Sequence, residues 1–163
     1  MALSLTALAP LAAADLCDKF EAQGISVESP VSISYIQEQN NYWSTACGDL
    51  KPTCIVAPSS AMEMSQVVKE LHDVDTFFAV KSGGHMPNNG FASIQDGILI
   101  STKNLDQVLY NADDETAVVG PGLAWEDAQL ALDKTASGRA IVGGRLGGVG
   151  VGGYMLGGRS HRS

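Results

Sequence analysis

The stretch Gly143–Ser163 reads GGRLGGVGVGGYMLGGRSHRS, and half of the chain's 18 glycines lie between Gly143 and Gly158. A glycine has no Cβ, so its backbone can approach another surface closely. So many glycines also weaken an ordinary helix or strand. The composition indicates a backbone strip that lies against a flat or phosphorylated ligand, and a flexible linker is the alternative. A flexible linker is the less consistent interpretation, because the run also contains apolar residues, which are Val149, Val151, Tyr154, Met155 and Leu156.

Within this run, Gly148, Gly150 and Gly153 satisfy the pattern GxGxxG of dinucleotide-binding folds. Such a fold also requires a helix that begins there and an acidic residue about 20 positions further on. No acidic residue follows Asp133 in this sequence. We therefore reject a Rossmann-type site.

A second glycine-containing loop lies upstream at Lys81–Gly90 and reads KSGGHMPNNG. It follows Thr76–Val80, an apolar run that predicts a strand. Ligands of open α/β sheets bind beyond the carboxyl ends of strands, where backbone N–H groups of such a loop can bind a phosphate. The same residue types also form plain turns. The loop contains no GK[ST], so it is not a Walker loop.

The residues before that loop predict a strand–helix–strand unit. Cys54–Ala57 is a β-favouring run that Pro58 stops. Ser60 and Glu63 fit a capping box, in which Ser60 accepts from the Glu63 amide and Glu63 reaches back. The helix that follows has an apolar face made of Met64, Val67, Val68 and Leu71. With Thr76–Val80 as the second strand, we expect parallel strands and a right-handed crossover.

Other elements are expected from short apolar or periodic runs. Asp15–Gln23 predicts a helix that Gly24 can cap, and Asn111–Glu115 predicts a turn. The remaining expected elements are strands at Gly97–Ser101 and Thr116–Val119, a helix at Ala124–Lys134 that stops near Gly138, and a short extended piece at Ala140–Val142.

The 163-residue chain carries a formal net charge of -8, and 45% of its residues are hydrophobic. These values are typical of a single globular domain. Nucleic acids and anionic membranes attract clustered Lys and Arg, so neither is an expected partner. No apolar run reaches membrane-spanning length, and the three histidines do not suggest a metal site.

The N-terminal sequence MALSLTALAPLAAAD is apolar, and Ala12 and Ala14 fit an A-x-A cleavage pattern. Residues 1–14 therefore predict a signal peptide and a secreted protein. The alternatives are an ordinary N-terminal segment or the start of a helix.

Three cysteines are spaced too widely for a CxxC motif. In an exported chain we expect a disulfide between Cys17 and Cys54, which would hold the N-terminus on a sheet strand, and a free Cys47. A Cys47–Cys54 bond is the competing arrangement.

The ordered set of KSGGH after a strand, VVGPGLAWEDA from Val118 and the glycine run resembles the FAD-binding, PCMH-type domain of the vanillyl-alcohol oxidase and berberine-bridge-enzyme-like flavoproteins. The similarity is greatest to fungal secreted members and runs from about Asp15 to Gly158. It implies an α+β fold, with a small βαβ subdomain and the start of a second mixed sheet. It divides the chain into an N-terminal segment at 15–50, an incomplete FAD-binding domain at 51–158 and a tail at 159–163 that is unlike the family.

The resemblance implies which residues contact FAD. His85 matches a histidine that is often bonded to the flavin 8α carbon, and an imidazole nitrogen is a suitable nucleophile for that bond. Many relatives form a second bond through a cysteine, but Leu146 stands at that position, so we expect one covalent link. The expected FAD-binding residues are Ser82, Gly83, Gly84, His85, Gly120, Gly122, Gly147, Gly148, Val149, Gly150, Gly152 and Gly153, whereas Trp125 is expected to pack.

The implied activity is that of an FAD-linked oxidoreductase. A small-molecule substrate of the alcohol, sugar or amine type would give a hydride to the flavin, which O2 would reoxidise. Val149 is expected beside the flavin's oxygen-reactive carbon, and the catalytic base is expected outside this stretch. Because the similarity covers only the first part of the family's domain, we expect the chain alone to be poorly stable and to lack turnover. The alternative is an inactive fragment, either cofactor-free or only binding FAD.

Overall fold

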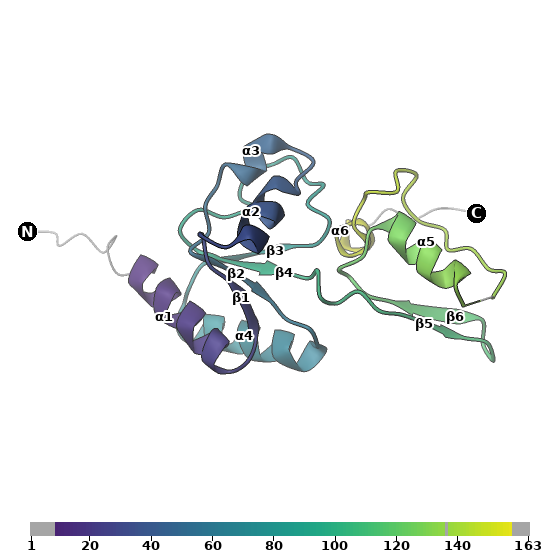
Figure 1. The fold of residues 1–163 in the computed structure, drawn as a ribbon, viewed down its shortest axis with the longest axis horizontal. Helices are drawn as coiled ribbons and strands as arrows, with labels where there is room; N and C mark the ends of the chain where they lie inside the picture. The colour runs from purple at the N-terminus through teal and green to yellow at the C-terminus, as the bar shows by residue number, and fades with distance from the viewer. Residues whose placement is uncertain (1–8, 136, 158–163) are drawn as a thin grey trace, which may run out of the picture.

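The computed structural model describes residues 9–135 and 137–157 (Figure 1). A four-stranded sheet with helices on both faces forms one part, and a two-stranded sheet with two helices forms the other. The predicted α+β class is confirmed. The elements are α1 (Ala9–Ala22), β1 (Ser26–Glu28), α2 (Ile33–Asn40), α3 (Thr45–Gly48), β2 (Cys54–Ala57), α4 (Ala61–Asp73), β3 (Phe78–Lys81), β4 (Ile98–Ser101), β5 (Val108–Asn111), β6 (Thr116–Val119), α5 (Trp125–Asp133) and α6 (Val151–Leu156).

The larger sheet has the strand order β1-β2-β4-β3. The two strands of the predicted strand–helix–strand unit, β2 and β3, are parallel as expected, and β4 lies between them. In this register Leu99 of β4 pairs with Ile55 on one side and with Ala79 on the other. β1 is antiparallel to β2 and occupies the far edge. The carboxyl ends of β3 and β4 therefore lie side by side.

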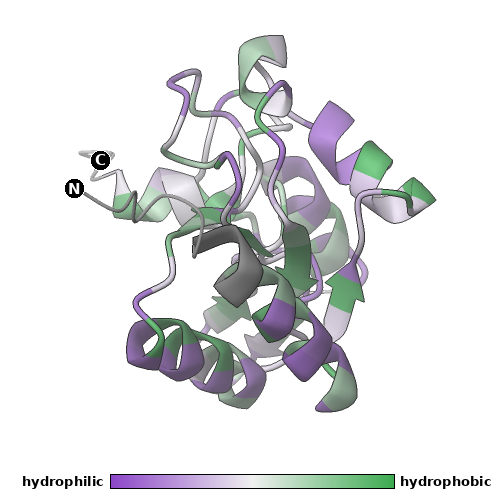
Figure 2. Cartoon of the chain, turned by 90° about the vertical axis from the view of Figure 1, so that its left-hand side faces the viewer, coloured by the Kyte–Doolittle hydropathy of each residue, from purple (hydrophilic) through white to green (hydrophobic). Residues whose placement is uncertain are grey.

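Helices cover both faces of this sheet. α1 and α4 lie on one face, where Phe20 and Leu71 pack with Val56 and Ile100. α2 lies on the other face, where Tyr35 packs with Ile55, Ala79 and Leu99. Figure 2 shows the strands largely in hydrophobic colours between helices of mixed colour. Burial on both faces explains why β4 is a continuous apolar run rather than an alternating one.

The start of α4 follows its predicted capping pattern in part. The Ser60 side chain accepts a hydrogen bond from the Glu63 backbone N–H at 3.2 Å, as expected. The Glu63 carboxylate, however, accepts from the backbone N–H of Ser59 at 2.8 Å and not from Ser60. The buried face of the helix is also narrower than predicted, because Val67 and Leu71 are buried whereas Val68 is 39% exposed.

In the smaller part, the predicted strand β6 and helix α5 are both present. The rest of this part was not fully predicted from the sequence. β5 was not predicted, but it pairs with β6 across the expected turn, where Asn111 Oδ1 accepts from the Asp113 N–H at 3.0 Å. Ala140–Val142, predicted as a short extended piece, lies in a segment without helix or strand.

Helix α6 is the largest correction to the sequence analysis. It occupies Val151–Leu156, where the glycine content predicts a non-helical strip. Burial of Val151 against Trp125 and Ala128 stabilises this helix despite its glycines.

The N-terminal helix α1 ends at Ala22, and Gly24 follows with φ +83°, as expected for a capping glycine. The helix begins at Ala9, so part of the predicted signal peptide is helical and Ala13 is buried. Secretion remains a prediction. Among residues 9–135 and 137–157, no helix has the length and apolarity that a bilayer crossing requires. The tail at 159–163 lies outside the described residues.

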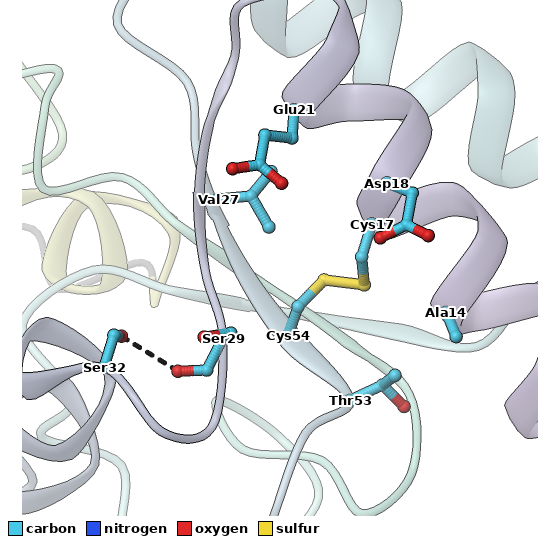
Figure 3. Close-up of a pocket in the computed structure, with 9 residues that line it drawn as sticks. All are labelled: Ala14, Cys17, Asp18, Glu21, Val27, Ser29, Ser32, Thr53 and Cys54. Atoms are coloured by element: carbon cyan, nitrogen blue, oxygen red, sulfur yellow. Dashed lines mark hydrogen bonds between the residues drawn. A yellow bond between two sulfur atoms is a disulfide. The ribbon is translucent and has the colours of Figure 1, made fainter.

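The predicted disulfide between Cys17 and Cys54 is confirmed, and it joins α1 to β2 (Figure 3). Cys47 is free and buried, with its Sγ 3.4 Å from the carbonyl oxygen of Met86. A hollow of about 290 Å³ lies beside the disulfide, and Asp18 and Glu21 of α1 are among the residues that line it.

We expect loss of the Cys17–Cys54 bond to lower the free energy of unfolding by about 3–4 kcal/mol, because the bond restricts the unfolded chain. Urea denaturation would be compared with and without dithiothreitol, for the wild type and for Cys17→Ala combined with Cys54→Ala. Dithiothreitol should destabilise only the wild type. Equal stability of the wild type in both conditions, or a Cys47–Cys54 peptide in a non-reducing map, would contradict this pairing.

Candidate functional site

The KSGGH loop and the glycine strip meet just beyond the carboxyl end of β3. Their closest point is between Gly83 and Gly150. A Cβ on Gly83 would lie 2.5 Å from the backbone nitrogen of Gly150, and a Cβ on Gly150 would lie 2.3 Å from that of Gly83. Real Cβ atoms do not approach backbone so closely, so both positions require glycine.

The turn at Gly120–Gly122 joins the same assembly. Ser82 Oγ donates a hydrogen bond to the carbonyl oxygen of Pro121 at 2.6 Å, and Thr102 Oγ1 donates to the same oxygen at 3.1 Å. The three segments that the sequence analysis expects to contact FAD are therefore brought together.

Packing within the chain accounts for several of the expected glycines. A Cβ on Gly120 would lie 2.0 Å from the Leu105 carbonyl oxygen, and one on Gly122 would lie 2.1 Å from that of Thr102. A Cβ on Gly147 would meet the Glu126 side chain. These glycines allow close contacts inside the protein, which requires no ligand.

Gly148 and Gly153 are different. A Cβ added at either position would meet no described atom within 4 Å. The glycine strip thus has one side packed on the protein and another side open.

Helix α5 holds the packed side of this strip. The Trp125 backbone N–H donates to the Val149 carbonyl at 3.0 Å, and the Val151 N–H donates to the Leu123 carbonyl at 2.9 Å. The Trp125 side chain is buried against Gly143 and Gly144, as expected for a packing residue. The strip therefore runs along the start of α5 in a fixed register.

Several backbone N–H groups at this junction have no acceptor. Within the described residues, those of Gly83, Gly84 and His85 donate no hydrogen bond, and neither do those of Gly148 and Gly150. Backbone N–H groups that have no acceptor within the protein can bind phosphate oxygens where a ligand reaches them. Gly84 and Gly150 are buried, whereas Gly83, His85 and Gly148 are partly or fully exposed. The donors of these three residues and the open side of the strip fit a flat cofactor with an anionic pyrophosphate.

His85 lies at the end of the loop and is half-buried. Its imidazole stacks on the indole of Trp43, with ring centroids 5.3 Å apart and an interplanar angle of 21°. The Trp43 backbone N–H donates to the Gly84 carbonyl at 3.1 Å. The sequence analysis missed this contact because the two residues are far apart in the chain and follow no shared pattern.

A buried polar cluster lies beneath the loop and also escaped prediction. Lys81, the last residue of β3, is fully buried, and its Nζ lies 2.7 Å from Glu38 Oε1 and 4.5 Å from the centroid of the Tyr42 ring. Ser101 Oγ donates to the same carboxylate oxygen at 2.9 Å. Burial lowers the pKa of the Lys81 ammonium, while the charge of Glu38 acts in the opposite direction. Burial, and then the Glu38 charge, raises the pKa of Tyr42.

Two hollows lie away from the KSGGH loop and the glycine strip. Besides the one at the disulfide, a hollow of about 250 Å³ is lined by residues of β5, β6 and α5 and by Arg139–Ile141. The expected FAD-binding residues line neither of these two hollows. No group of three or more His, Cys, Asp or Glu in the described part of the chain could hold a metal ion.

Sequence comparisons identify relatives of this chain. An uncharacterized FAD-linked oxidoreductase of Arthroderma benhamiae is 56% identical over 145 residues, which cover 88% of this chain and 28% of that protein. The FAD-dependent monooxygenase macF of Penicillium terrestre is 45% identical over 116 residues, which cover 71% of this chain and 22% of that protein. The chain therefore spans less than a third of the length of these relatives.

Solved structures share the fold. A glucooligosaccharide oxidase from Acremonium strictum, whose description names a 6-S-cysteinyl, 8α-N1-histidyl FAD, gives a TM-score of 0.74 at 22% identity over 89% of this chain and 30% of its own. Physcomitrella patens BBE-like 1 gives 0.70 at 21% identity over 88% of this chain and 30% of its own. These matches confirm the expected PCMH-type architecture.

The family model described as an FAD binding domain matches residues 52–162. This match covers more than half of the chain and includes both glycine segments that meet at Gly83 and Gly150. The chain thus belongs to the FAD binding domain family found in FAD-linked oxidoreductases.

Proposed function

We propose that this chain forms the N-terminal part of the FAD site in a longer FAD-linked oxidoreductase. The observation that carries the proposal is the contact of Gly83 with Gly150, beside which Gly148 faces open space. The contact places the unbonded N–H groups of the KSGGH loop beside the strip, and the missing Cβ of Gly148 leaves room there for a ligand. FAD needs both features, because it carries an anionic pyrophosphate and a flat ring system.

In this proposal, different segments of the chain contact different parts of FAD. The N–H groups around Ser82–Gly84 bind the pyrophosphate, and the strip Gly147–Gly153 lies beside the flavin. His85 provides the single covalent link, because Leu146 has no nucleophilic atom for a second one. When bound, FAD supplies an acceptor for a hydride from an alcohol, sugar or amine-type substrate.

We also propose O2 as the electron acceptor of the full-length enzyme, with Val149 beside its path. Val149 is half-buried and packs against the cluster of Trp125, Ala128 and Val151. A larger side chain at this position would therefore press either on that cluster or on the open side of the strip. Only pressure on the open side of the strip would change the access of O2 to the flavin.

A second candidate function is that of a fragment that binds FAD without turnover. It is favoured by the exposed apolar side chains on and near the strip, which are Val142, Leu146, Met155 and Leu156. Apolar surface of this kind invites association or a further covering segment. Turnover by the purified 163-residue chain with added FAD would exclude this candidate.

In the full-length protein, His85→Ala should abolish covalent attachment of FAD. Acid-precipitated wild-type protein should stay yellow, whereas the variant should release its flavin into the supernatant. His72→Ala is the matched control, because His72 is exposed and lies in the last turn of α4, outside the KSGGH loop. A pellet of His85→Ala that stays yellow would refute the assignment.

Two glycine variants separate folding from cofactor binding, and both would be made in the His85→Ala background so that FAD binds reversibly. Gly83→Ala forces a contact between backbones, so the cofactor-free protein should lose about 1–3 kcal/mol of unfolding free energy. Gly148→Ala adds a methyl group to open space, so its stability should stay near that of the parent. Its affinity for FAD should fall about tenfold, which corresponds to about 1.4 kcal/mol. Denaturant titration and FAD titration measure the two effects, and unchanged FAD binding by Gly148→Ala would remove the strip from the site.

Val149→Ile should slow the reoxidation of the reduced full-length protein by O2, because the larger side chain narrows access in a tightly packed region. Val151→Ile is the control, since Val151 packs in the same cluster and the substitution adds the same methylene. Stopped-flow measurements in air-saturated buffer would compare the three proteins. If both variants slow equally, the effect is one of packing, and Val149 has no role in oxygen access.

A further inference from the structure

The N-terminal segment contacts the KSGGH loop from outside the family match, which begins at residue 52. The Trp43 backbone N–H donates to Gly84, and the Trp43 indole stacks on His85. Gly84 has φ +64°, and a Cβ there would lie 2.9 Å from the carbonyl oxygen of Asn41. Asn41 and Trp43 of the N-terminal segment therefore contact both the backbone of the loop and one face of the His85 imidazole.

The stack is the interaction that orients the His85 ring. Within residues 9–135 and 137–157, neither imidazole nitrogen of His85 has a hydrogen-bond partner. An imidazole without such a partner is free to change its χ1 and χ2 rotamers unless packing restrains it. The near-parallel Trp43 indole supplies that restraint on one face and leaves the ring nitrogens unbonded.

We propose that Trp43 is a positioning residue for the attachment of FAD to His85, an inference that rests on the proposed function. In this attachment, a bond forms between an imidazole nitrogen and the 8α carbon, and one C–H bond and the imidazole N–H bond break. Two electrons and the two protons pass to the isoalloxazine system, which is thereby reduced, so no other oxidant is required. Trp43 takes no part in these bond changes. It limits the imidazole to orientations in which a nitrogen can reach the carbon.

The exposure of Trp43 makes this role separable from folding. The Trp43 side chain is 65% exposed, so its removal opens no cavity in the core. Phe91 lies in the same loop region as His85 and is 66% exposed, with no ring contact to the histidine. Phe91→Ala is therefore a matched control for the loss of an exposed aromatic side chain.

The test measures the rate of attachment in the full-length protein, prepared without FAD and then mixed with saturating FAD. Acid-stable flavin is followed over time by intact-protein mass, and reversible FAD binding and thermal unfolding are measured in parallel. An aromatic contact of this kind contributes enough to expect attachment about two- to tenfold slower in Trp43→Ala. Trp43→Phe should restore most of the rate, and Phe91→Ala should match the wild type.

The outcomes that oppose the inference are distinct. If Trp43→Ala attaches FAD at the wild-type rate, the positioning role is overturned and the proposed function is unaffected. If Trp43→Ala and Trp43→Phe are equally slow and both unfold at a lower temperature, the role is only structural and the inference is overturned. If the wild type binds FAD but forms no bond at His85, the covalent part of the proposed function fails together with the role of Trp43.

Discussion

The site depends on the contact between the backbones of Gly83 and Gly150. This contact fixes the distance between a loop that ends a strand of one sheet and a strip that lies on helix α5 of the other part. Any side chain larger than hydrogen at either position would separate them, because the opposing atoms are backbone and cannot rotate away. Packing of backbone on backbone therefore determines how the loop and the strip meet.

The Lys81–Glu38 pair supports that contact from below. Lys81 is the residue immediately before Ser82, so its position sets where the loop begins. A fully buried ammonium group is costly without a partner, and breaking such a pair typically costs about 3–5 kcal/mol. Glu38 in turn is fixed by Ser101, at the end of the neighbouring strand β4. The loop thus begins at a point that two parallel strands and α2 determine together.

Elements that depend on local pattern were predictable from the sequence. β2, β6, α4 and α5 follow from short apolar or periodic runs. The Cys17–Cys54 bond was the preferred one of two pairings that the cysteine positions left open. β5 was missed because only its pairing with β6 makes Val108–Asn111 a strand. α6 was missed because glycine disfavours helix, and only the burial of Val151 overrides that preference. The meeting of the glycine segments at one site was predicted only through the family resemblance. The contacts of Lys81 and His85 with the N-terminal segment could not be predicted, because no motif or spacing links these residues.

The contacts of the N-terminal segment show that the folded unit extends beyond the matched family model. The family match begins at residue 52, yet β1 pairs with β2, Tyr35 packs on the sheet, and the disulfide joins α1 to Cys54. A chain that began at residue 52 would leave Lys81 without its partner Glu38. It would also lose α2 from one face of the larger sheet and α1 from the other face, where only α4 would remain. Removing so much apolar burial and an ion-pair partner would cost more than the marginal stability of a small domain. The KSGGH loop therefore requires the N-terminal segment for its conformation, although the matched family model begins after that segment.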